Sequence, residues 1–382
     1  MDNVDTIDVA DASPEAWYTL AEERGWGDGL PTLPPTEDAI ARFLGSASWS
    51  EHMLPGPIPP RWVRANARSL AANAVMAGCR PEYFAVVVAG LHAVLQADFN
   101  LTGVLATTHP CTPILVLSGP VRLDIGLNCG AGCLGQGTRA NAATGRAFHL
   151  IMQNIGGAVP GRMDLATHGA PTKFSYCFGE NEESSPWEPY HVRHGFAPEE
   201  SVVTVMAAEA PHNINDHGSE TGDELVTTIA GTISQVGCNN LLLGGPHLLV
   251  LGPEHAATLH EDRWTVQQIQ EAVFERSRIP VERVAAANRD EIASWGRSPE
   301  NGAYTVGNTP DDLHVVVAGG RGKHSLWIPS FAASQAVSHR IGTGPSIDTS
   351  SPIDTGSPID TGSPIGSGQS GDDPTGRENR DR

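Results

Sequence analysis

Four short apolar runs in the middle of the chain constrain its fold more than any other feature. They are PILVLSGP (113–120), SVVTVMAA (201–208), HLLVLGP (247–253) and LHVVVAGG (313–320). Nearly continuous apolar runs of this length, rich in β-branched residues, are typical of strands covered on both faces. Helical sequence separates the runs, as in TRANAATGRAFHLIMQNI after the first and EHAATL after the third. We therefore predict an α/β fold, a layered sheet of short buried strands with flanking helices, whose strand ends carry the site.

The ends of the chain differ in composition from its centre. The first 40 residues hold ten acidic residues and one arginine, and residues 347–366 repeat units such as IDTGSP. Sequence this polar cannot bury enough apolar surface to offset the entropy lost on ordering. We predict four parts: an acidic N-terminal segment (1–24), a helical N-terminal portion (25–100), an α/β catalytic domain (101–342) and a disordered low-complexity tail (343–382).

Composition excludes several classes of partner. The net charge is −20 and no basic stripe is present, so we expect no nucleic acid and no anionic membrane surface as partner. The longest apolar stretches are too short to span a bilayer, and the first residues lack the features of a secretory signal. Six cysteines in 382 residues do not form a disulfide framework. We expect a cytoplasmic protein with reduced thiols and a small-molecule substrate, either as a monomer or as a homo-oligomer.

Several longer stretches carry a family resemblance. They are DGLPTLPPT, NAVMAGCRPEYF, TRANAATGRAFHLIMQNIGG, GENEESSPWEPYHVRHGF, LGPEHAATL and VVVAGGRGKHSLWIPSF. Together they resemble a poorly characterised bacterial family associated with UGSC-motif (seleno)proteins, as genomic neighbours or as fusions. The resemblance covers most of residues 25–342 and implies thiol or selenol chemistry on a small molecule. This chain has no UGSC-like motif, so a separate thiol or selenol redox protein would have to supply it.

A glycine-rich loop, LNCGAGCLGQG, holds two cysteines in front of a predicted helix. Cys129 and Cys133 could form a redox pair, because the following helix start and the charge of Arg139 would favour a thiolate. Arg139 is also predicted to bind substrate. Gly130 and Gly132 would offer backbone donors to a bound carboxylate or a developing oxyanion. The formal G-x-G-x-x-G match lacks the adjoining strand and the downstream acid of a dinucleotide site. The alternative is a packed loop that needs small residues.

Two further groups of residues suit acid–base chemistry. His109 and Cys111 flank a proline before the first apolar run and could form a thiolate–imidazolium pair, although a buried structural cysteine is the alternative. After the second run, His212 or His217 could transfer protons while Asp216 orients the imidazole. The alternatives for this PHNINDH segment are a divalent-metal site with His212 and His217 as ligands, or a plain turn.

Two loops are predicted to bind substrate. In GGRGKHS, after the fourth run, the predicted anion-binding residues are Gly320, Lys323, His324 and Ser325. The loop ENEESSPWEPYHVRH contributes Glu182 and His191 as a lid or a binding loop. A glycine turn and a solvated acidic turn are the respective alternatives.

These observations predict an enzyme that uses cysteine and histidine chemistry on a small polar molecule, of the oxidoreductase or sulfur-transfer type. Thiolates of Cys129, Cys133 or Cys111 would be the nucleophile. One alternative is a metal-dependent lyase or hydrolase. Another is a non-catalytic subunit that presents substrate to a redox partner. The sequence does not name a cofactor beyond the divalent metal of the first alternative.

Overall fold

The computed structural model describes residues 7, 13–45 and 54–342. The described residues belong to one compact unit that spans Met1–Ile347. The predicted tail and residues 1–6 and 8–12 of the predicted acidic segment lie outside the described residues. Among the described residues, no single helix is long and apolar enough to cross a bilayer; one pair of segments meets that criterion only together, across an 80° bend.

The α/β prediction is confirmed, and the strands form two four-stranded sheets. The first sheet has the order β10 (Val337–Arg340), β3 (Val202–Ala208), β1 (Thr112–Ser118), β2 (Cys177–Gly179). The second has the order β4 (His212–Asn215), β9 (His324–Ile328), β5 (His247–Leu251), β8 (Leu313–Val317). A short pair, β6 (Arg278–Pro280) and β7 (Ala303–Thr305), stands apart. The four apolar runs thus form β1, β3, β5 and β8, two in each sheet.

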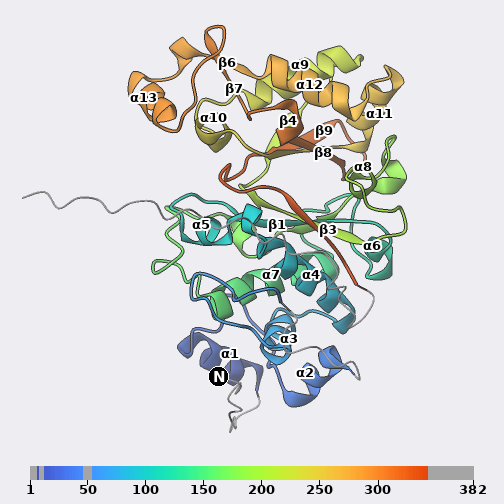
Figure 1. Cartoon of the computed structure of the whole chain (residues 1–382). Helices are drawn as coiled ribbons and strands as arrows, with labels where there is room; N and C mark the ends of the chain where they lie inside the picture. The colour runs from blue at the N-terminus through green and yellow to red at the C-terminus, as the bar shows by residue number, and fades with distance from the viewer. Residues whose placement is uncertain (1–6, 8–12, 46–53, 343–382) are drawn as a thin grey trace, which may run out of the picture. The chain divides into compact units, whose positions relative to one another are not determined.

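The two sheets pack face to face, and helices cover their outer faces (Figure 1). Along β1, Ile114 points into the core between the sheets, whereas Leu115 points into the core under the helices. Along β5, Val250 points into the core between the sheets and Leu249 into the core under the helices of the second sheet. Because successive side chains of a strand point to opposite faces, a strand between two cores must be apolar at nearly every position. This arrangement explains the continuous apolar runs.

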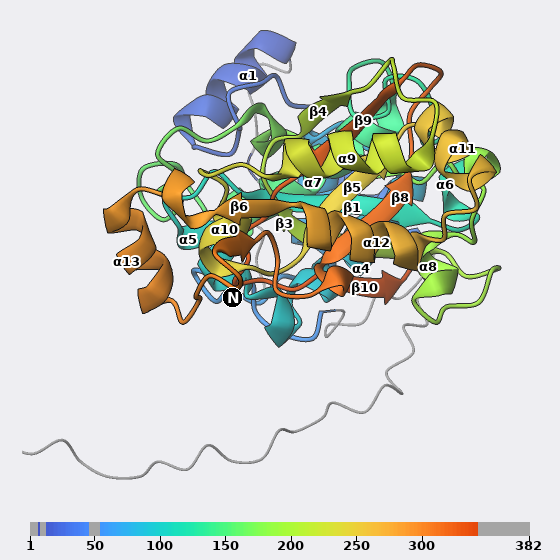
Figure 2. The same cartoon turned by 90° about the horizontal axis from the view of Figure 1, so that it is seen from above.

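The helices form two layers, seen again from above in Figure 2. The first sheet is covered by α3 (Ala67–Met76), α4 (Phe84–Val94) and α7 (Arg139–Ile151); the second by α9 (Gly222–Ile233), α11 (Pro253–Glu261) and α12 (Val266–Arg276). The other helices are α1 (Pro14–Glu23), α2 (Glu37–Leu44), α5 (Leu101–Ala106), α6 (Val121–Asp124), α8 (Tyr190–Arg193), α10 (Asn239–Leu243) and α13 (Ala286–Ser294). Single-turn segments are η1 (Pro81–Tyr83), η2 (Ala97–Phe99), η3 (Met152–Gly156), η4 (Pro171–Lys173), η5 (Glu182–Ser184), η6 (Val281–Arg283) and η7 (Pro310–Asp312).

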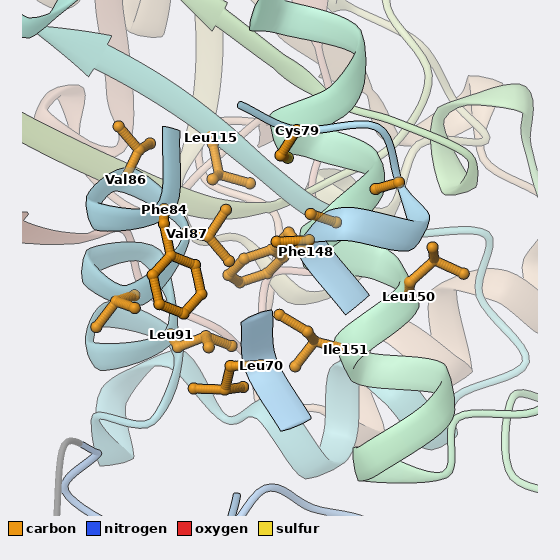
Figure 3. Packing of buried hydrophobic residues seen from close by; sticks show 14 of the residues in the cluster. Leu70, Cys79, Phe84, Val86, Val87, Leu91, Leu115, Phe148, Leu150 and Ile151 are labelled. Atoms are coloured by element: carbon orange, nitrogen blue, oxygen red, sulfur yellow. The ribbon is translucent and has the colours of Figure 1, made fainter. Parts of the chain in front are cut away.

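The helical N-terminal portion shares one hydrophobic core with the first sheet. Figure 3 shows Phe84 and Leu91 of α4 beside Phe148 of α7, with Leu115 of β1 above them in this view. The contact is close, because a Cβ atom at Gly90 would lie 3.0 Å from the Phe148 ring. The predicted helix start near Arg139 is confirmed, since α7 begins at that residue.

Each sheet is built from the same succession of strands, and the fourth strands are exchanged. Two parallel strands joined through a helix (β1–α7–β2 and β5–α12–β8) precede an antiparallel third strand, β3 or β9. The strand that follows β3 joins the second sheet, and the strand that follows β9 joins the first. At the crossing point the hydrogen bonds are reciprocal: Glu209 N donates to Pro329 O and Phe331 N donates to Ala207 O, each at 2.8 Å. The two halves therefore form an internal structural repeat.

Candidate functional site

The carboxyl ends of β1 and β2 in the first sheet and of β8 in the second meet at one edge of the molecule. Ser118 ends β1, and Glu180 directly follows β2 and donates its backbone N–H to Leu117 O at 2.9 Å. The loop after β2 also reaches β8, because Asn181 N donates to Val317 O at 2.7 Å. Both views place α6 and α8 at this edge (Figures 1 and 2). Open α/β sheets place their ligands at such carboxyl ends.

Three side chains at this edge form a candidate metal centre. One ligand atom from each of Glu180, Glu182 and His191 lies within 4.8 Å of the other two. We call these three residues the Glu–His cluster. Glu180 and His191 are each 1% exposed, and the side chain of Glu182 is 15% exposed. The sequence predicted Glu182 and His191 as substrate-binding residues, and the structure brings these two together.

Glu180 is fixed from both sides. It accepts a hydrogen bond from Ser118 Oγ at 2.8 Å and another from Tyr190 N, at the start of α8, at 2.9 Å. Burial raises the pKa of its carboxyl to about 7, although the hydrogen bonds from Tyr190 and Ser118 oppose the shift. The carboxylate therefore joins the end of β1 to α8 and holds the cluster at the strand ends.

Arg122 positions the second carboxylate. Its side chain is 3% exposed; it pairs with Glu182 at 2.8 Å and with both oxygens of Glu183 at 3.2 Å. The same guanidinium donates to Gly119 O at 3.0 Å and to Glu180 O at 2.8 Å. Its hydrogen bond to Glu183 lowers the pKa of that carboxyl. Gly119 N also donates to Glu182 Oε1 at 2.6 Å, so the carboxylate has few alternative positions.

His191 is the unusual member of the cluster. Neither ring nitrogen has a hydrogen-bond partner among the described residues, and the Nδ1 atom lies 4.0 Å from Glu182 Oε1. Buried polar atoms in proteins are nearly always hydrogen-bonded, and an exception points to an ion or a water molecule. Imidazole and carboxylate are common ligands of Zn²⁺ and of neighbouring divalent metals. The residues present therefore fit a divalent cation.

The cysteine loop reaches the edge of the Glu–His cluster. Cys129 Sγ lies 3.8 Å from Arg122 Nη1 and against Gly179, the last residue of β2. Burial raises the pKa of the Cys129 thiol, although Arg122 opposes the shift. Cys133 is buried between the sheets, and burial raises its pKa to about 11. Both thiols are free, and Asn141 of α7 secures the loop by donating to Cys133 O at 3.0 Å.

The two predicted glycine loops contact each other. Gly319 N donates to Cys129 O at 2.9 Å, and a Cβ atom at Gly320 would lie 2.6 Å from Cβ of Ala131. The second loop is also joined to the cluster's own loop, because Asn181 Nδ2 donates to Gly319 O at 3.2 Å. The loops with Gly130, Gly132 and Gly320 therefore line the same edge as the Glu–His cluster.

The residues after Gly320 lie around the carboxyl end of β5. Lys323 Nζ donates to His217 O at 3.3 Å, and His324 Nδ1 lies 3.2 Å from Asn213 Oδ1. Ser325 is buried, and its hydroxyl lies 2.8 Å from Nδ1 of His255 in the first turn of α11. The other ring nitrogen of His255 lies 3.0 Å from Asp216 O, so this imidazole is fully hydrogen-bonded.

The structure places His109 and Cys111 at the other end of β1. Thr112 to Ser118 spans about 20 Å of strand, so these residues lie far from the Glu–His cluster. His109 Nε2 lies 2.9 Å from Glu209 Oε1. Cys111 is buried, and burial raises its pKa to about 12. Nothing in this geometry joins the pair to Cys129 and Cys133.

His212, Asp216 and His217 do not assemble into one group. His212 is exposed at the first position of β4. Burial raises the pKa of Asp216, but hydrogen bonds from Ser219 and Gly218 outweigh it and lower that pKa to about 2. The His217 ring lies 5.0 Å from the His324 ring. In the part of the chain that the structure describes, the group of three metal-type ligands contains neither His212 nor His217.

The site residues predicted from the sequence include neither Arg122 nor Glu180. A signal was present, since both are charged residues that follow a buried strand at its carboxyl end. The strand before Glu180 has only three residues, so its periodicity could not be recognised. Arg139, predicted to favour a thiolate and to bind substrate, lines a cavity on the outer face of α7.

Comparison with known proteins gives no match: the chain matches no family model, no curated protein and no solved structure. The family resemblance stated above therefore stays a prediction. Function has to be argued from the residues at the strand ends.

Proposed function

We propose that this protein is a metal-dependent hydrolase or lyase for a small polar molecule, with Glu180, Glu182 and His191 holding a divalent cation. The observation that carries the proposal is the His191 imidazole, which is buried, has no hydrogen-bond partner among the described residues and lies beside two carboxylates. The carboxylates of Glu182 and Glu183 share the single guanidinium of Arg122, and a cation at the cluster would add a positive charge beside them.

The chain's own residues prepare the site in three ways. Ser118 and Tyr190 orient Glu180, while Arg122 and Gly119 orient Glu182. Bound there, a divalent metal would supply a Lewis acid and lower the pKa of a coordinated water. The glycine loop after β8 lies beside the cluster and is suited to lining a substrate. Replacing a residue that orients a metal ligand typically weakens metal affinity by about 10- to 100-fold.

Thiol chemistry at Cys129 is the second candidate. Its sulfur lies next to Arg122, and it is the one cysteine of the six that is not buried. In this alternative, Cys129 would carry out an oxidoreductase or sulfur-transfer reaction together with a thiol or selenol protein. The chain could instead serve as the substrate-binding subunit of that protein. The raised pKa of the thiol counts against it, because the thiolate is the reactive form. The cytoplasm stays the proposed location, since all six thiols are free.

Metal binding to the purified full chain tests the proposal. After treatment with a chelator, Mn²⁺ or Zn²⁺ is titrated calorimetrically into the wild type, Glu182→Gln and His191→Asn. The matched control is Glu188→Gln, in the same loop but outside the cluster. We expect about one ion per wild-type and control chain, and an affinity at least about tenfold weaker in the two cluster variants. An apo protein that takes up no stoichiometric metal, or equal affinity in all four proteins, would overturn the proposal.

A further inference from the structure

A cavity of about 500 Å³ lies on the outer face of α7 and shares no residue with the Glu–His cluster. One wall consists of Arg139, Ala142, Ala143 and Arg146, whose spacing places them on one face of the helix. The volume is within the range of about 300–1,000 Å³ typical of small-molecule pockets. Arg139, which the sequence analysis predicts to bind substrate, belongs to this cavity.

The segment with Leu30 and Leu33, which also lines the cavity, is hydrogen-bonded to α7. Arg146 donates to both carboxylate oxygens of Asp28 at 2.8 Å, and to the carbonyls of Leu30 and Pro31 at 3.0 Å. The segment continues onto α3, because Leu33 N donates to Met76 O at 3.1 Å. The largely buried guanidinium of Arg146 therefore fixes this segment to α7.

This fixed wall presents apolar side chains to solvent. Leu30 is 41% exposed and Leu33 is 51% exposed, although the backbone on both sides is anchored. Phe174, on another side of the cavity, is 45% exposed. The small residues Ala77 and Gly78 also line the cavity. Apolar surface grouped around a cavity in this way is typical of a ligand site.

One cation accompanies the apolar wall. Arg139 Nε donates to Gly78 O at 2.8 Å, which sets the plane of the guanidinium. Its terminal nitrogens have no hydrogen-bond partner among the described residues, so they are available to a ligand. Arginine presents two parallel donors that match a carboxylate. The hydroxyl of Ser175 is not available, since it donates to Ala142 O at 2.8 Å.

We propose that this cavity binds a small carboxylate with an apolar body, the carboxylate on Arg139 and the body against Leu30, Leu33 and Phe174. Charge complementarity selects the head group, and the apolar lining selects the body. The binding site is separate from the proposed metal centre and does not depend on it.

Binding of defined probes tests this proposal. Octanoate, hexanoate, octanol and acetate are titrated into the full wild-type chain and followed by calorimetry or ligand-observed NMR. We expect saturable octanoate binding, about tenfold weaker binding of hexanoate, which buries two fewer methylene groups, and acetate binding too weak to saturate. Octanol should bind at least about tenfold more weakly than octanoate, since it lacks the carboxylate that forms charge-assisted hydrogen bonds with Arg139.

Variants locate the site. Arg139→Gln should weaken octanoate about tenfold and leave octanol unchanged. Leu33→Asp and Leu30→Asp should weaken both probes, whereas Leu165→Asp, at a leucine that is 48% exposed outside the cavity, should weaken neither. Circular dichroism melts confirm that each variant is folded. The proposal is overturned if octanoate does not saturate, if Arg139→Gln binds it as wild type does, or if Leu165→Asp weakens it as much as Leu33→Asp.

Discussion

His191 and Glu182 lie beside each other without a hydrogen bond, with Nδ1 of the imidazole 4.0 Å from Oε1 of the carboxylate. The carboxylate is held by Arg122 and Gly119, and the imidazole is held by burial alone. A buried polar group without a partner destabilises a fold by about 1–3 kcal/mol. The metal-free protein therefore carries a local destabilisation that a bound cation would remove.

Replacing His191 by leucine should separate stability from metal binding. We expect His191→Leu to be as stable as the metal-free wild type or more stable by about 1 kcal/mol, because it removes two unpaired buried nitrogens. Metal at 100 times its Kd should stabilise the wild type by about 2.7 kcal/mol and the variant not at all. Urea unfolding with and without metal measures both effects.

His255→Leu is the matched control for that substitution. His255 is also buried, but Ser325 Oγ and Asp216 O lie within hydrogen-bond distance of its ring nitrogens. The same change should therefore destabilise the fold by about 1–3 kcal/mol. If both variants lose stability equally, His191 is a structural residue and the metal proposal loses its main support.

Two glycine-to-alanine changes should shift stability in opposite directions. A Cβ atom at Gly252, between β5 and α11, would collide with the backbone oxygen of His324. We expect Gly252→Ala to destabilise the fold by about 1–3 kcal/mol. Gly231 lies in α9 with nothing near its Cβ position, so Gly231→Ala should stabilise by about 1 kcal/mol. Chemical denaturation of the two variants checks the prediction; equal effects would contradict it.

Acidification should destabilise the fold through His247. Burial lowers the pKa of this imidazole from 6.5 to about 3, and Trp327 Nε1 donates to its Nδ1 at 2.9 Å. Between these two pH values the unfolded chain binds the proton and the folded chain does not, so stability falls as pH falls from about 6.5 to about 3. The loss from this group approaches about 5 kcal/mol at the lower end.

His247→Asn tests that origin of the acid sensitivity. Its amide oxygen can still accept from Trp327, and the side chain does not take up a proton in this range. Unfolding free energies at pH 7 and pH 5 should differ less in this variant than in the wild type. His168→Asn, at an exposed histidine, should keep the wild-type difference. An unchanged pH dependence in His247→Asn would contradict the prediction.

Cys129 should be the first thiol to react with an alkylating reagent. The other five cysteines are buried, and burial raises the pKa of each, to about 12 for Cys111 and about 11 for Cys133. Peptide mapping after brief treatment with iodoacetamide at pH 8 should find modification at Cys129, and Cys129→Ser should show no fast site. Equally fast modification of Cys133 would instead support a reactive pair in this loop.

The sequence by itself determined where the main strands lie and which ends of them carry polar loops. The run ILVL in β1 can be recognised as a strand because its side chains alternate between two apolar cores. Every position of the run is therefore apolar. The start of α7 at Arg139 is a local property of the same kind. The contact between the cysteine loop and the loop at Gly319 is not local in this sense, because the cysteine loop lies between α6 and α7 and does not directly follow a strand.

Only the tertiary structure decided that there are two sheets, that β4 and β10 exchange between them, and that Glu180 and Glu182 meet His191. Strand pairing depends on contacts between residues far apart in the chain, such as Ala208 with Ser330, which no local period encodes. The same reason separates His109 from Cys129: His109 precedes β1, whereas the loop with Cys129 comes after β1 and α6 and lies near the opposite end of the strand. Arg122 gains its role only where folding places it between carboxylates from a loop about 60 residues away.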